Sequence, residues 1–380
     1  MQEQKNYPQH RTAPGDGTGA GPAVRPARTK RPHRPGTVSV WKRDYAMDYL
    51  RVAAMLGVIM IHVSSRYVAM DSSVTFLGAN LPYWFNQISR FSVPLFILLS
   101  GAALNRSQMP LAGAKGILAF YRRRCWKILP AYVVWTLVYY LEGHGFDFPS
   151  LFQFSFLREL LLGSAAPHLY FIIVLLQCYL LYPLLRHWME RAPFPCLLVS
   201  FLITFCSQML LVFRSAGLDG LRLPAVFWQL VPAWLFYFMA GMALTPERMT
   251  ALRQFSLRNT AVFLPAGLVL AVFAGLEGRV AWDPGLTLRP LLLPYQFITL
   301  PALLAAWGVM THLPKMAKLI GFLARHSMTI YFGHVLVLGF LWERIDFPGT
   351  VGFGFLYLSV LALASLFAAV LDRILSRLKR

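Results

Sequence analysis

The sequence predicts an all-α polytopic membrane protein with about ten transmembrane helices and both termini in the cytoplasm. Three observations carry this prediction: the composition, the series of apolar runs and the placement of the positive charges. Of the 380 residues, 57% are hydrophobic and only 14% are charged, a composition that excludes an ordinary soluble protein. Ten apolar runs are long enough, or nearly so, to span a hydrocarbon core of about 30 Å. They lie at about 46–63, 87–104, 128–142, 168–185, 194–213, 225–244, 260–276, 290–311, 327–342 and 352–371.

The lysines and arginines fall mainly on one predicted side of these runs. When the N-terminus is assigned to the cytoplasm, 27 of the 36 basic residues, including every lysine, lie in cytoplasmic segments, and only 8 lie on the opposite side. This is the bias of the positive-inside rule. The formal net charge of +20 is therefore a topology signal, and nucleic-acid binding is not needed to explain it. We expect the protein in the inner or plasma membrane.

The N-terminal segment differs in composition from everything after it. Residues 1–42 are rich in Pro, Gly, Arg and Thr and have almost no apolar side chains. Such a segment cannot bury enough surface to offset its ordering entropy. We therefore predict a disordered, basic cytoplasmic tail, either attracted to anionic lipid or simply solvated. Residues 43–380 form the predicted transmembrane domain.

The first run carries three ionisable side chains, Asp48, Arg51 and His62. Arg51 and His62 are eleven positions apart, which returns a helix to within about 20° of the same azimuth, about 16 Å further along its axis. Both can therefore line one groove, with Asp48 pairing to Arg51 three positions away. Ionisable side chains within a membrane helix indicate a functional site. An interfacial arginine beside a hydrogen-bonded core histidine is the alternative.

The second run opens with an arginine and contains a Ser-Gly pair. Its segment RFSVPLFILLSG begins at Arg90 and reaches Ser100 and Gly101. The proline and the small residues predict a helix that packs closely on a neighbour, with Arg90 and Ser100 supporting the site. A kinked helix with an arginine anchor at the interface explains the segment equally well.

A basic cluster precedes the third run. The segment YRRRCWKILP holds Arg123, Arg124 and Lys127 among four cations in six positions. At the cytoplasmic face these cations can bind a diphosphate, or they can contact anionic lipid headgroups.

Two more histidines lie in or next to later runs. His168 opens the fourth run within His-Leu-Tyr-Phe, and His334 lies inside the ninth. Each is either functional or an ordinary interfacial or hydrogen-bonded histidine. The four cysteines have no CxxC or CxxH spacing, so the sequence predicts no metal site.

Taken in order, these segments resemble integral membrane acyltransferase family 3, the bacterial polysaccharide O-acetyltransferases, from about residue 43 to 372. The resemblance rests on Asp-Tyr-Leu-Arg with a histidine eleven after the arginine, Phe-Ser-Val-Pro-Leu-Phe then Ser-Gly, Arg-Arg-x-x-Lys-Ile-Leu-Pro-x-Tyr, His-Leu-Tyr-Phe, and a late Ile-Tyr-x-x-His. Each motif is short, and their order and spacing carry the resemblance. The lack of an appended hydrolase-like domain implies a stand-alone member.

The resemblance implies roles for the residues that match the family's motifs. His62 matches its essential histidine and Arg51 the arginine before it, which we expect to be catalytic. Arg51 and the basic motif would also bind acyl-coenzyme A, a co-substrate taken from the cytoplasm; no cofactor is expected to be bound permanently. Tyr170 replaces the usual tryptophan, and Gln177 stands where some branches have a glutamate.

The implied reaction transfers an acetyl group to a hydroxyl of a glycan or lipid-linked saccharide at or beyond the outer face. His62 either deprotonates that hydroxyl or accepts the acyl group first, and the sequence leaves both routes open. Succinyl can replace acetyl. The alternative is a transporter or flippase of glycans or lipids, because ten spans with buried charge fit either. The sequence does not indicate an oligomeric state.

Overall fold

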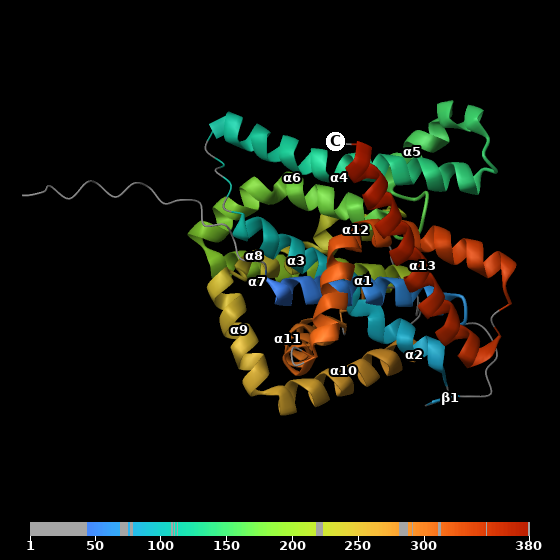
Figure 1. The fold of residues 1–380 in the computed structure, drawn as a ribbon. Helices are drawn as coiled ribbons and strands as arrows, with labels where there is room; N and C mark the ends of the chain where they lie inside the picture. Colours follow the sequence, from blue (N-terminus) through green and yellow to red (C-terminus); the bar gives the residue numbers. More distant parts are fainter. Residues whose placement is uncertain are drawn as a thin grey trace, which may run out of the picture. The chain divides into compact units, whose positions relative to one another are not determined.

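The computed structural model of the chain is helical almost throughout (Figure 1). It describes residues 44–68, 75–76, 79–107, 109, 111, 113–217, 223–280, 288–290, 292–310, 313–346 and 348–378. The α-helices are α1 (Tyr45–Ser65), α2 (Leu81–Ile88), α3 (Ser92–Arg106), α4 (Gly113–Gly143), α5 (Phe154–Leu162), α6 (Tyr170–Arg191), α7 (Pro193–Ser215), α8 (Leu235–Ala243), α9 (Pro246–Arg258), α10 (Thr260–Val280), α11 (Leu292–Met310), α12 (Pro314–Arg344) and α13 (Gly349–Leu378). The predicted tail, 1–42, lies outside the described residues.

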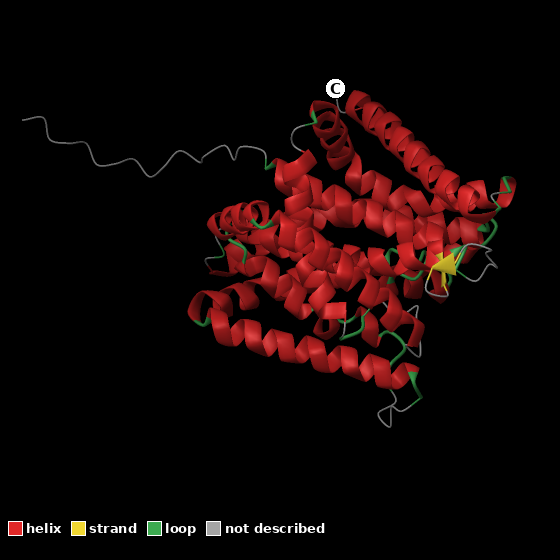
Figure 2. Ribbon diagram, turned by 90° about the horizontal axis from the view of Figure 1, so that it is seen from below, coloured by secondary structure: helices red, strands yellow, loops and turns green. Residues whose placement is uncertain are grey.

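Short 3₁₀ turns and one small hairpin complete the described elements. The turns are η1 (Ser89–Phe91), η2 (Phe148–Phe152), η3 (Phe227–Gln229) and η4 (Val231–Ala233). Within the described residues, the strands β1 (Thr75–Phe76) and β2 (Ala79–Asn80) are the only strands, and they pair antiparallel just before α2 (Figure 2). The fold is therefore all-α, as the sequence predicts.

Helix α1 is central, and it packs against α2, α3, α11, α12 and α13 (Figure 1). Of an 18-residue apolar stretch in each helix, 61% is buried inside the protein in α1 and 72% in the segment from α2 to α3. The corresponding share is only 22% in α10 and in α13. Apolar helix surface that the protein does not cover requires lipid around it. The helix with the predicted catalytic residues is thus enclosed by protein, and α10 and α13 are peripheral.

The first turn of α1 is fixed by one carboxylate, that of Asp44. Asp44 caps the helix, its side chain accepting hydrogen bonds from the backbone N–H groups of Ala46 and Met47 at 3.1 and 3.3 Å. Its other oxygen pairs with Arg106 of α3 at 2.7 Å. Such a cap satisfies N–H groups that the helix itself cannot. From this cap α1 runs to Ser65 without a break.

Helices α3 and α8 cross with their backbones nearly in contact. A Cβ atom on Gly101 would lie 2.2 Å from the carbonyl oxygen of Phe238, and one on Gly241 would lie 1.9 Å from that of Leu98. These distances exclude any side chain at either position without movement of the backbone. The prediction that the Ser-Gly segment packs closely on a neighbour is confirmed, and the neighbour is α8.

Seven helices are long and apolar enough to cross a membrane, counted among the described residues. They contain seven of the ten predicted runs. Of the other three, the run 128–142 is the second half of α4, and the run 327–342 lies in the second half of α12. The first halves of both helices contain basic residues that the charge pattern assigns to cytoplasmic loops. These basic segments are therefore helical and continuous with the apolar runs that follow them.

The predicted run 225–244 is wrong as a continuous helix. Only Leu235–Ala243 is α-helical there, and the 3₁₀ turns η3 and η4 precede it. Pro232 cannot donate a backbone hydrogen bond, and the hydroxyl of Thr204 on α7 bridges two backbone groups at this point. It donates to the carbonyl of Pro232 at 2.9 Å and accepts from the N–H of Phe236 at 3.0 Å. Contacts from another helix thus shape this segment.

We expect Gly241→Ala to destabilise the protein by about 1–3 kcal/mol, the usual range for overpacking a close contact. The matched control is Gly354→Ala on α13, where a Cβ atom meets nothing within 4 Å. Thermal unfolding of the purified proteins in detergent measures both. Equal melting temperatures for the two variants would contradict the close crossing.

Candidate active site

Three histidines from distant parts of the chain meet beside α1. His62 lies near the end of α1, His168 in the turn before α6, and His334 in α12. The ring centroids are 6.0 Å apart for His62 and His168, 5.2 Å for His62 and His334, and 4.9 Å for His168 and His334. His168 and His334 are fully buried and His62 partly so. The structure therefore joins the three histidines that the sequence selected separately.

The orientation of His334 is fixed by its own helix. Its Nδ1 is 2.6 Å from the carbonyl oxygen of Tyr331. A carbonyl can only accept, so Nδ1 carries the proton, and Nε2 of the neutral ring is a free acceptor. No described residue provides a hydrogen-bond partner for Nε2. The Tyr331 hydroxyl, in turn, donates to the backbone carbonyl of His168 at 2.7 Å, which ties the turn before α6 to α12.

A tyrosine from α4 is inserted into the backbone of α12 next to His334. The hydroxyl of Tyr139 donates to the carbonyl of Phe332 and accepts from the N–H of Leu336 at 3.1 Å. It thereby bridges a donor and an acceptor four residues apart, the spacing of an α-helical hydrogen bond. Side chains inserted in this way are a recognised cause of helix bending. Tyr139 thus helps to place His334, and no motif in the sequence indicates this role.

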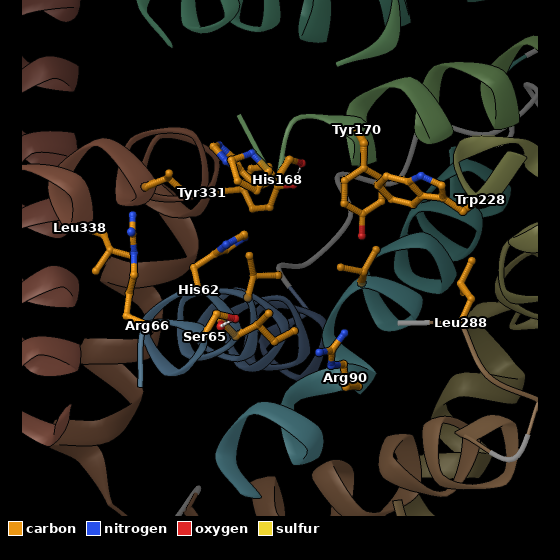
Figure 3. Close-up of a pocket in the computed structure, with 15 residues that line it drawn as sticks. His62, Ser65, Arg66, Arg90, His168, Tyr170, Trp228, Leu288, Tyr331 and Leu338 are labelled. Carbon is orange, nitrogen blue, oxygen red and sulfur yellow. Dashed lines mark hydrogen bonds between the residues drawn. The ribbon is translucent and has the colours of Figure 1, made fainter. Parts of the chain in front are cut away.

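A cavity of about 720 Å³ opens beside the histidines (Figure 3). Fifteen residues line it: Val58, Ile61, His62, Ser65, Arg66, Arg90, Val93, Pro167, His168, Tyr170, Trp228, Leu288, Tyr331, Val335 and Leu338. This volume is within the range of ligand sites, about 300–1,000 Å³. His334 is behind the wall, and His62 and His168 face the cavity. The cavity is therefore the place where a substrate can reach an imidazole.

Arg90 lies in the cavity wall, and Asn86 holds it in place. The guanidinium donates from Nε and Nη2 to Oδ1 of Asn86 at 3.2 and 2.7 Å. The amide nitrogen of Asn86 donates to the carbonyl of Ile61 and to the hydroxyls of Ser64 and Ser65, at 3.0–3.2 Å. These bonds link Arg90 to the last turn of α1, beside His62. Sequence analysis selected Arg90 but not Asn86, although its place four residues before Arg90 is a helical signal for such a pair.

Two aromatic rings form the opposite wall. The rings of Tyr170 and Trp228 have centroids 4.4 Å apart. Gln177 of α6 holds the segment that carries Trp228: its amide donates to the carbonyl of Gln229 at 3.0 Å and accepts from the N–H of Val231 at 3.2 Å. Tyr170, which departs from the family pattern, lines the cavity. Gln177 stands where some branches of the family have a glutamate. Here its amide bonds only backbone groups among the described residues, and the position supplies no carboxylate.

The other predicted site residues are not among those that line this cavity. Arg51 Nη1 pairs with Asp48 Oδ1 at 3.1 Å, which confirms the predicted pair, but only His62 of the predicted Arg51–His62 groove faces the cavity. Ser100 donates within its own helix, to the carbonyl of Phe96 at 2.8 Å.

The basic cluster lies on the first half of α4. Arg123 and Lys127 are exposed, and Arg124 donates to the hydroxyl of Ser107 at 3.1 Å. These residues remain available to a ligand outside the cavity. No group of three or more His, Cys, Asp or Glu within the described ranges is arranged to hold a metal ion.

One comparison with known proteins identifies a relationship. A family model described as "Acyltransferase domain" matches residues 44–371, a range that contains all three histidines, the cavity and the basic cluster. Neither the curated proteins nor the solved structures include a match to the chain.

We expect Tyr139→Phe to lower the free energy of unfolding by about 1–3 kcal/mol, because it leaves a partly buried N–H and a buried carbonyl of α12 without their shared partner. The control is Tyr121→Phe on the same helix, which loses one exposed hydrogen bond, to the carbonyl of Leu180. Thermal unfolding compares them. If Tyr121→Phe proved as destabilising as Tyr139→Phe, the inserted hydroxyl would not support α12.

Proposed function

This chain belongs to acyltransferase family 3, and from that premise we propose that it moves an acetyl or other short acyl group from cytoplasmic acyl-coenzyme A to a hydroxyl of a glycan. The family match covers most of the chain, so the chain is a membrane acyltransferase. The proposal of donor and acceptor rests on one observation, the cavity beside His62. His62 and His168 line this cavity, and the ring of His334 packs against that of His62. The family match favours this enzyme over a transporter.

We place the acceptor in the cavity and the donor at the other end of α1. The residues that line the cavity include Arg66, Arg90, Trp228 and Leu288, which lie in segments at or near the predicted outer face. Arg51 is eleven residues before His62, about 16 Å away along the helix axis. The basic cluster of α4 is on the predicted inner side as well. We place the protein in the inner or plasma membrane with both termini in the cytoplasm, a topology that accommodates this arrangement.

In the proposed reaction, His62 acts as the general base. Its imidazole takes the proton of the acceptor hydroxyl, while the hydroxyl oxygen attacks the thioester carbon. The new C–O bond forms, the C–S bond breaks, and the imidazolium returns the proton to the sulfur of the leaving coenzyme A. His334 presents Nε2, an acceptor, beside His62, and it can stabilise the protonated ring. General-base catalysis of this kind contributes about 10²–10⁴-fold.

We therefore expect His62→Ala to lower transfer by at least about 10²-fold while expression and membrane insertion persist. His144→Ala is the control, because His144 is an exposed histidine in the turn after α4. Transfer is measured as label moved from radioactive acetyl-coenzyme A to surface glycan. Wild-type transfer by the His62 variant would refute the proposed base.

The basic cluster gives a separate expectation. Replacing Arg123 and Lys127 together by alanine should raise KM for acetyl-coenzyme A about tenfold or more, with kcat nearly unchanged, because charge-assisted contacts to phosphate are lost away from the reacting atoms. Arg253→Ala removes an exposed cation from α9, also on the predicted cytoplasmic side, and should leave KM unchanged. An unchanged KM in the double variant would mean that these residues serve only lipid contact.

A further inference from the structure

Among the described residues that line the cavity beside His62, the permanent charges are all positive. Two of its fifteen lining residues, Arg66 and Arg90, are permanently cationic, and none is an aspartate or a glutamate. Walls of low dielectric strengthen the field of such charges and concentrate ligands of opposite sign. The charge of the lining therefore bears on which acceptor the cavity selects.

The position of Arg90 is set before any ligand arrives. The residue is only 5% exposed, and Asn86 accepts from two of its nitrogens. In Figure 3 its guanidinium points up into the space between His62 and the aromatic wall. A binding group that is already oriented loses little conformational entropy when a ligand binds. Arg66 differs: it is exposed and has its guanidinium 5.8 Å from the Trp342 ring, so it stands at the edge of the cavity.

The wall opposite His62 suits a sugar ring. Trp228 is partly exposed to the cavity and packs against Tyr170. In Figure 3 the hydroxyl of Tyr170 points into the cavity. Aromatic faces pack against the apolar C–H face of a pyranose, and a nearby hydroxyl serves the ring's polar edge. Apolar walls with a few convergent polar groups are the usual form of a ligand site.

From these features we propose that the acceptor is an anionic saccharide. Its ring lies on Trp228 and Tyr170, its carboxylate or phosphate binds Arg90 and Arg66, and one hydroxyl points toward His62. The inference rests on the proposed function, since it identifies the cavity as the acceptor site. It goes further by naming the charge of the acceptor, which the family membership does not give.

The test is a binding measurement that needs no acyl transfer. Purified protein in detergent is titrated with methyl glucuronide, glucose 1-phosphate and methyl glucoside, and saturation-transfer NMR gives Kd for each. The wild type should bind at least one anionic sugar about tenfold more tightly than the neutral one, the usual effect of a charge-assisted contact. A comparison of the Kd values of methyl glucuronide and glucose 1-phosphate shows whether the site prefers a carboxylate or a phosphate. Glycerol 3-phosphate, a fragment of lipid headgroups, should bind more weakly than the preferred sugar.

Variants separate the two parts of the site. Arg66→Gln, at the exposed edge, should reduce the preference for the anionic sugar, and Arg90→Gln should abolish it, with methyl glucoside binding unchanged in both. Arg344→Gln removes an exposed cation that does not line the cavity and should keep the preference. Trp228→Ala should weaken anionic and neutral sugars by the same factor.

Three results would overturn the inference: equal binding of charged and neutral sugars, no binding of either anionic sugar at millimolar concentration, or glycerol 3-phosphate binding as tightly as the sugars. None of them depends on acetyl-coenzyme A. A protein that still transferred acetyl groups through His62 but showed any of these results would keep its proposed function and lose the anionic acceptor.

Discussion

The packing of three histidines, from α1, from α12 and from the turn before α6, is the constraint on which this structure depends. One tyrosine, Tyr331, holds two of them: its carbonyl accepts from Nδ1 of His334, and its hydroxyl donates to the backbone carbonyl of His168. The ring of His168 has no hydrogen-bond partner among the described residues, so its backbone and the packing of the neighbouring rings fix its place. These contacts tie α12 to the turn before α6, and both then pack on His62 of α1. Helix α3, which crosses α8 closely, and helix α12 both pack against α1.

The arrangement separates two tasks along one helix. Near its end α1 presents His62 to a cavity with an arginine and an aromatic wall. Near its start, Arg51 pairs with Asp48. In the proposed reaction the donor comes from one side of the membrane and the acceptor from the other, and about 16 Å of α1 separates these two residues. In this proposal the cavity receives the acceptor, and the basic first half of α4 contacts the donor.

The sequence indicates the ionisable residues of the site but not the hydrogen bonds that hold them together. His62, His168 and His334 are conspicuous because imidazoles are costly in apolar runs, and periodicity is enough to place Asp48 beside Arg51. Tyr139 carries no such signal, because its hydrogen bonds reach residues far away in the chain. Asn86 shows only its four-residue spacing to Arg90, and nothing in the sequence indicates its bonds to the end of α1. For the same reason the segment 225–244 reads as a helix by composition, whereas Thr204 and Gln177 of other helices hold its backbone in 3₁₀ turns.

The central claim is that the acyl group is passed on at His62, and a structure of the protein with its donor tests this most directly. The measurement is cryo-electron microscopy of the purified protein with an acetyl-coenzyme A analogue whose thioester sulfur is replaced by a methylene group. The account predicts the acyl carbonyl in contact with the His62 ring, with the diphosphate toward Arg51 and the basic turn of α4. An analogue bound with its acyl end away from His62, or entering through the cavity past Arg66 and Trp228, would contradict it.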